Sequence, residues 1–164
     1  MNFWDRTIRN HGLEHATISL LMQEFGMSGP LAGYSIPNGF FILGKISFNQ
    51  VEEAVTQAFG QLLLGKRSLA VSPFCGTNIL TSAALATVAS VTSYKASGGG
   101  LKGLNQAFSG VMIALIASQP IGKIIQQRFT TSPDMAHLRV GEIKQYQLGP
   151  ITLHWINTSV FTGP

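Results

Sequence analysis

Two histidines and a glutamate lie close together near the start of the chain, in the stretch His11-Gly12-Leu13-Glu14-His15. Two imidazoles one helical turn apart can hold a zinc ion, and a carboxylate beside them can take a proton from a metal-bound water. His11 and His15 are therefore candidate metal ligands, and Glu14 is the candidate general base. Imidazole also ligates chlorophyll magnesium and haem iron, and the spacing does not separate these from zinc.

A helix from Arg9 to Phe25 is predicted to carry these side chains on a buried side. At about 100° per residue, they share a sector with the apolar residues that follow, Ile18, Leu21, Met22 and Phe25. Burying imidazoles and a carboxylate is unfavourable unless they are paired, hydrogen-bonded or bound to a cation. Three interpretations stay open: a metal site, a buried polar network or contact with a neighbouring subunit or pigment, and no special role.

A zinc site needs at least one more protein ligand. Cys75, the single cysteine, is the predicted third ligand, although the stretch "SPFCGTN" around it also fits a structural turn capped by Thr77 or Asn78. The other candidates are acids and histidines from later segments: Glu52, Glu53, Asp134, His137 and His154. The last two lie in or beside predicted strands, where a lone histidine is usually an ordinary surface or half-buried residue.

The surrounding elements predict an α+β protein. The stretch "GMSGPLAGYSIPNG" reads as a loop, and Phe40 to Gly44 as a buried strand. A helix follows, with Asn49 as its N-cap and Glu52 three residues later, and Gly65 ends it.

Near the C-terminus two strands are predicted on either side of Leu148-Gly149-Pro150. In the second strand, residues 151, 153 and 155 are apolar and alternate with polar residues, which predicts that this apolar set faces the interior: Ile151, Leu153 and Trp155.

Composition favours a membrane protein. Only 11% of residues are charged and the mean hydropathy is +0.24, against roughly 25% charge in an average soluble chain. Charge-free stretches at residues 78–94 and 103–122 approach the length of about 20 residues that a spanning helix needs. They predict a two-helix transmembrane hairpin. The alternative is a pair of small-residue helices buried in a soluble core.

The predicted organisation has three parts: residues 1–67 with the histidine helix, residues 68–127 as the transmembrane hairpin, and residues 128–164 as a β-hairpin packing with the first part. The soluble part would hold two helices and a few-stranded sheet. Apart from Lys95 and Lys102, the lysines and arginines lie outside the two apolar stretches and their connecting loop, which favours cytoplasmic termini. These basic residues are scattered and not interleaved with aromatics, so nucleic-acid binding is not expected.

Four motifs occur in order along the chain: "HGLEHAT", "IPNGFFILGK", "PFCGTN" and "TTSPDM". Together they resemble an uncharacterised family of bacterial membrane proteins associated with cyanobacteria and other phototrophs, over a range from about His11 to Ile156. The resemblance implies an integral membrane protein with an H-x-L-E-H-A helix and implies no activity. In the family that the chain resembles, a histidine often precedes the proline of the third motif, where this chain has Ser72.

Two functions follow as expectations. The first is a non-catalytic accessory or structural subunit of a larger membrane complex, photosynthetic or respiratory, in contact with the lipid bilayer and with larger subunits. The second is a small membrane-bound zinc hydrolase or peptidase, because His11 to His15 also resembles the H-x-x-E-H motif of the inverted zincins. The small size and few polar residues favour the first, since a peptidase needs a substrate cleft beside its metal.

Overall fold

The computed structural model describes residues 2–24, 26 and 31–161, and the chain divides into two compact units. The first unit is Met1–Ser72 with Gln127–Pro164, and the second is Pro73–Gln126. The elements in chain order are α1 (Phe3–Glu24), β1 (Ala32–Ile36), β2 (Gly39–Gly44), α2 (Phe48–Leu63), the short 3₁₀ helix η1 (Arg67–Ala70), α3 (Gly76–Ala96), α4 (Gly100–Ile125), the π-helical turn η2 (Gln126–Thr130), β3 (Leu138–Leu148) and β4 (Ile151–Val160).

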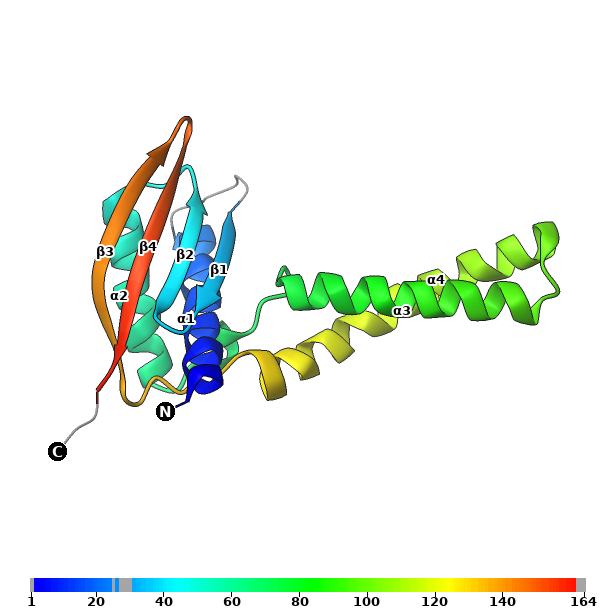
Figure 1. Cartoon of the computed structure of the whole chain (residues 1–164), viewed down its shortest axis with the longest axis horizontal. Helices are drawn as coiled ribbons and strands as arrows, with labels where there is room; N and C mark the ends of the chain where they lie inside the picture. Colours follow the sequence, from blue (N-terminus) through cyan, green and yellow to red (C-terminus); the bar gives the residue numbers. More distant parts are fainter. Residues whose placement is uncertain (1, 25, 27–30, 162–164) are drawn as a thin grey trace. The chain divides into compact units, whose positions relative to one another are not determined.

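The first unit contains a four-stranded antiparallel sheet with strand order β1-β2-β4-β3 (Figure 1). This confirms the α+β class, the strand at β2 and the C-terminal hairpin. Gly149, with a φ of 62°, makes the tight turn between β3 and β4. The loop predicted before β2 was wrong in part, because it contains β1, where Tyr34 pairs with Phe41. Its glycines and prolines signalled turns and hid a short edge strand.

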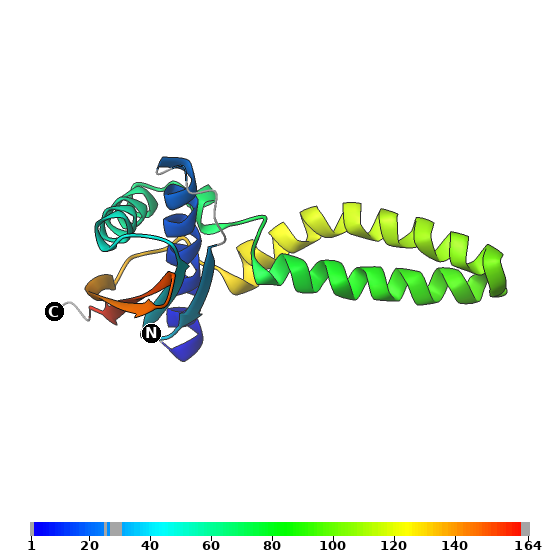
Figure 2. The ribbon, with the colours of Figure 1, turned by 90° about the horizontal axis from the view of Figure 1, so that it is seen from above.

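Helices α1 and α2 pack on one face of this sheet (Figures 1 and 2). From α1 the core takes Leu13 and Leu21, and from α2 it takes Val51 and Val55, all fully buried. The inward side chains of the sheet complete the core, chiefly Phe40 and Ile42 of β2 and Ile156 of β4. This first unit therefore has its own hydrophobic core.

The face of β4 that points into the core is opposite to the predicted one. Thr152, His154, Ile156 and Thr158 are buried, whereas Ile151, Leu153 and Trp155 lie half-buried on the outer face. The buried threonines are satisfied: the Thr152 hydroxyl lies 2.8 Å from the carbonyl oxygens of Gly44 and Ile46. Alternation gave the period of the strand, and the hydrogen-bond partners of its two threonines, Thr152 and Thr158, favour the set that faces inward.

The predicted ends of two helices also need correction. Helix α1 begins at Phe3, six residues before the predicted Arg9, and its predicted end at Phe25 lies outside the described residues. The N-cap of α2 is Ser47 rather than Asn49, because Ser47 and Gln50 form a reciprocal capping box. The sequence "SFNQVEE" offers two overlapping capping patterns, and the earlier one is used.

The second unit is a pair of antiparallel helices, α3 and α4, joined by a tight turn (Figures 1 and 2). Small residues of α4 face α3 and are buried: Gly103, Ala107, Ala114, Ser118 and Gly122. Large apolar side chains of α4 point outward and are exposed, including Phe108, Ile113 and Ile116. The apolar surface of this unit is thus on its outside.

Among the described helices, only the continuous run Gly100–Thr130 is long and apolar enough to cross a membrane. This run comprises α4 and η2. The expectation that both helices span is not supported, because α3 falls short of the same criterion. Its composition explains this: α3 is rich in serine and threonine, whose hydroxyls bond backbone carbonyls one turn back, as Thr81 does to Thr77.

Candidate functional site

Helix α1 brings the two predicted histidine ligands together. The ring centroids of His11 and His15 are 4.3 Å apart, with the planes inclined at 63°. His15 is buried and His11 is half-buried. The spacing of one helical turn therefore gives the neighbouring pair that the sequence predicted.

Each ring is held by a hydrogen bond to a backbone carbonyl oxygen of another segment. Nδ1 of His11 lies 2.7 Å from the oxygen of Thr130, and Nδ1 of His15 lies 3.0 Å from the oxygen of Ala70. A carbonyl oxygen only accepts, so each Nδ1 must carry the proton and donate it. In the neutral ring, Nε2 then holds the lone pair. This is the tautomer and orientation that metal-binding histidines commonly have, with Nδ1–H bonded to an outer carbonyl.

Gly12 lets these two backbone segments approach the helix. A β-carbon at this position would lie 2.2 Å from the carbonyl oxygen of Ser132 and 3.3 Å from the β-carbon of Ala70. The Ser132 amide also donates to the carbonyl oxygen of Ile8, at 2.8 Å. The glycine inside the motif therefore allows close backbone packing, and His11 and His15 flank that contact.

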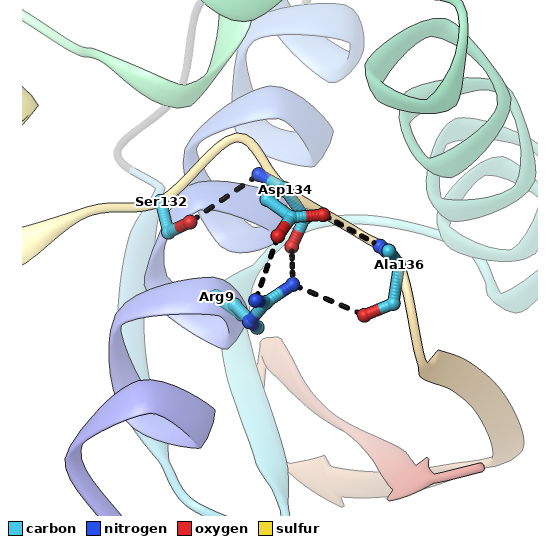
Figure 3. A network of polar contacts seen from close by, with 4 residues as sticks. All are labelled: Arg9, Ser132, Asp134 and Ala136. Atoms are coloured by element: carbon cyan, nitrogen blue, oxygen red, sulfur yellow. Dashed lines mark hydrogen bonds and ion pairs between the residues drawn. The ribbon is translucent and has the colours of Figure 1, made fainter. Parts of the chain in front are cut away.

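Arg9 holds the segment around Asp134 and Ala136, which follows the partner of His11, Thr130. Its guanidinium forms an ion pair with Asp134 at 2.7 Å and donates to the carbonyl oxygens of Asp134 and Ala136 (Figure 3). The Asp134 carboxylate also accepts from the Ala136 amide at 2.9 Å. The side-chain hydrogen bond from Arg9 lowers the pKa of Asp134 below its usual value. Asp134, a candidate third ligand, is therefore engaged by Arg9.

The carboxylate of Glu14 lies against β1. The Ser35 hydroxyl donates to Glu14 Oε2, and a β-carbon at Gly33 would meet Glu14 Oε1 at 2.2 Å. The Nδ1 atoms of His11 and His15 instead face the segments at Thr130 and Ala70. Glu14 thus has a hydrogen-bonded position at the sheet, which favours a structural role for it over that of a general base.

The remaining third-ligand candidates are spread over the chain. Glu52 and Glu53 are exposed on α2, and His137 is exposed, with a φ of 66°. His154 is buried in β4, in the core of the sheet. These positions, exposed or buried in the core of the sheet, give no reason to add the four residues to the histidine pair.

Cys75 belongs to the second unit, where it is the N-cap of α3. Its Sγ accepts from the Thr77 amide at 3.4 Å, so the cap is the cysteine rather than Thr77 or Asn78. The prediction that Cys75 is a metal ligand is not tested by the geometry of the first unit and stays a prediction.

Sequence reasoning missed Arg9 and Asn10. The Asn10 amide donates to the Ile36 carbonyl oxygen at 2.7 Å, and its Oδ1 accepts from the Thr158 hydroxyl at 2.8 Å. Asn10 is fully buried. Asn10 directly precedes the motif. A polar residue in a helix that is covered on several sides could have indicated a buried hydrogen-bonding position. The carbonyl oxygens of Ala70 and Thr130 leave no signal, because every residue has one.

The family described as "Domain of unknown function (DUF6391)" matches residues 6–143. An uncharacterized protein of Picosynechococcus sp. (strain ATCC 27264 / PCC 7002 / PR-6) is 31% identical over 148 residues, which cover 82% of this chain and 70% of that protein. No solved structure matches the chain.

Proposed function

Since the chain belongs to the DUF6391 family, whose description names no function, we propose its role from the residues themselves. We propose that it is a non-catalytic accessory subunit of a larger membrane complex, such as a photosynthetic or respiratory one. The pair of α3 and α4 would serve as its anchor, and the α+β unit would carry its contacts with larger subunits.

The observation that carries this proposal is the distribution of side chains in the second unit. Small residues fill the contact between the helices, while large apolar residues are exposed. In the most apolar stretch of Gly100–Thr130, only 17% of the residues are buried. A core helix of a soluble protein is mostly buried. Exposed apolar surface on this scale is stable in a bilayer or against other apolar helices.

Close packing of α3 on α4 supports a joint anchor even though α3 alone is marginal. A β-carbon at Gly110 would lie 2.5 Å from the Ser93 hydroxyl oxygen, and the Ser82 and Ser118 hydroxyls are 2.7 Å apart. These polar contacts face inward, where α4 shields them from lipid. With 21 and 26 residues, the helices are about 32 and 39 Å long, enough for a hydrocarbon core of about 30 Å.

If both helices span, the two parts of the α+β unit lie on the same side of the membrane. We assign that side to the cytoplasm, because most lysines and arginines belong to this unit. Lys95 and Lys102 flank the turn between the helices and would emerge on the opposite side.

Two measurements test the proposal. Alkaline extraction of membranes should leave the protein in the pellet, and Ile113→Lys on the exposed side of α4 should release part of it, since lysine at a helix centre opposes insertion by about 3 kcal/mol. Tyr146→Lys, at an exposed position of β3, is the control and should stay in the pellet. In mild detergent the protein should co-migrate with larger subunits on a native gel. Migration only as a monomer in several detergents would contradict the accessory role.

The second candidate function is a zinc hydrolase. The Nδ1 hydrogen bonds of His11 and His15 favour metal binding by these two residues. Catalysis would in addition require Glu14 to act as the general base. Glu14→Gln should then abolish hydrolysis of a peptide library while zinc stays bound. Unchanged hydrolysis, or none in the wild type, would remove this candidate.

A further inference from the structure

We infer that the Nε2 atoms of His11 and His15 bind one divalent transition-metal ion of the zinc class, and that this ion has a structural role. By fixing the two rings, it would strengthen the hydrogen bonds that join α1 to the two chain segments where the first unit is interrupted and resumes. This inference concerns the first unit alone and does not depend on the accessory role.

The first step of the argument is the orientation of the rings. Both Nδ1 atoms donate to backbone carbonyl oxygens, at 2.7 and 3.0 Å, so both neutral rings place their lone pairs on Nε2. The rings are adjacent, with centroids 4.3 Å apart. Two neighbouring imidazoles of the same tautomer, each held by an outer carbonyl, form the outer-shell arrangement that orients metal ligands.

The second step is the choice of metal. Imidazole nitrogen suits zinc, copper, iron and nickel, whereas magnesium and calcium prefer oxygen ligands. The carboxylates near this part of α1 already have partners: Glu14 accepts from Ser35, and Asp134 is paired with Arg9. The donor set is therefore nitrogen-based, which selects the zinc class.

The third step is the position of the pair along the chain. Ala70, the partner of His15, lies two residues before Ser72, where the first part of the unit ends. Thr130, the partner of His11, lies three residues after Gln127, where the unit resumes. An ion on the two Nε2 atoms would fix both rings and so strengthen the Nδ1 hydrogen bonds that join the helix to Thr130 and Ala70.

A zinc ion usually takes four ligands, so two further groups would complete its shell. Cys75 is the third ligand that the sequence predicts, and it belongs to the second unit.

The experiment uses the full chain in mild detergent, stripped with a chelator and titrated with Zn²⁺ alone, and with Co²⁺ as a spectroscopic probe. We expect saturable binding of about one ion per chain and a higher melting temperature with Zn²⁺ but not with Mg²⁺. His15→Asn and His11→Asn should weaken binding by more than about 100-fold, beyond the loss typical of outer-shell changes. Asparagine can keep the donor near Nδ1 while removing Nε2, so the fold should be retained.

His137→Asn is the matched control, because asparagine tolerates the positive φ of this exposed position. It should bind zinc as the wild type does. A thiolate-to-cobalt absorption band that disappears in Cys75→Ser would support Cys75 as a ligand. Its absence in the wild type would remove Cys75 from the set.

Absence of saturable Zn²⁺ binding by the folded wild type, or equal affinity of the folded His15→Asn protein, would overturn the inference. If either asparagine variant fails to fold, the melting temperature of the wild type with and without Zn²⁺ decides. Neither result bears on co-migration with larger subunits, so the accessory role can fail or stand separately.

Discussion

Gly12 of α1 lies so close to the backbone of Ser132 that a side chain on it would collide with that backbone. The carbonyl oxygen of Ser132 lies 2.2 Å from where a β-carbon on Gly12 would be, a distance at which the helix or the crossing segment has to move. The histidines on either side of Gly12 hydrogen-bond to the neighbouring carbonyls of Ala70 and Thr130. The motif at His11–His15 is therefore a surface for backbone contact as well as a candidate metal site.

Gly12→Ala should destabilise the protein by about 1–3 kcal/mol, the range for overpacking, although alanine is the better helix former by about 1 kcal/mol. Gly60→Ala in α2 is the control, because nothing lies within 4 Å of its added β-carbon. That variant should be stabilised by up to about 1 kcal/mol. Urea unfolding followed by circular dichroism measures both, and equal shifts would contradict the close packing of Gly12 on Ser132.

His154 should make stability depend on pH. It is fully buried, and neither ring nitrogen has a hydrogen-bond partner among the described residues. Burial lowers the pKa of His154 below its ordinary 6.5. The nearby Ile42 backbone raises this pKa and so opposes the shift in part. The unfolded chain therefore takes up this proton first, and stability should fall as the pH drops below about 6.5, by up to about 1.4 kcal/mol per pH unit.

His154→Leu should remove that part of the slope between pH 7.5 and pH 5, since leucine has no proton to gain. Unfolding in urea at several pH values, in the presence of chelator, gives the comparison. His137→Asn, at an exposed position, gives the comparison with the loss of another histidine. A slope that is unchanged in His154→Leu would assign the pH dependence to other groups.

The ion pair between Arg9 and Asp134 should contribute modestly to stability. Because Arg9 lowers the pKa of Asp134, this contribution is present above the ordinary value of 3.8 and is lost as the pH falls through the lower, folded value. The Asp134 side chain is 54% exposed, so Asp134→Asn should cost less than about 1 kcal/mol at pH 7. The difference from the wild type should vanish in strong acid.

Glu142→Gln is the control for this prediction. Its partner Lys144 lies 3.3 Å away, and both side chains are at least half exposed, so its loss should change the unfolding free energy less than that of Asp134. A larger effect for Glu142→Gln would contradict the importance of the Arg9 contacts (Figure 3).

The packing of α3 on α4 should depend on Gly122. A β-carbon there would lie 2.1 Å from Oδ1 of Asn78, which accepts from the Gln126 amide at 2.8 Å. Gly122→Ala should disturb this buried amide pair and lower the stability of the helix pair in detergent by about 1–2 kcal/mol. Gly76→Ala, with open space around its β-carbon, should have little effect. Unfolding in sodium dodecyl sulfate followed by circular dichroism compares the two, and equal melting would contradict the prediction.

Local sequence determined several features of this protein. The α+β class, the strand at β2, the β3–β4 hairpin around Gly149 and the nearness of His11 to His15 all follow from patterns within a few residues. Helical spacing places residues four apart on one face, and a glycine at a tight turn has few alternatives. Composition likewise gave the apolar helix at Gly100–Thr130.

Tertiary structure decided the rest, because it depends on atoms that are distant in sequence. The strand β1 became visible only through its pairing with β2, and β4 turned Thr152 and His154 inward because the sheet and α1 offered partners to its threonines. The two histidines gained their tautomers from the carbonyl oxygens of Ala70 and Thr130. Backbone acceptors are the same in every residue, so only the folded chain determines which of them a side chain meets.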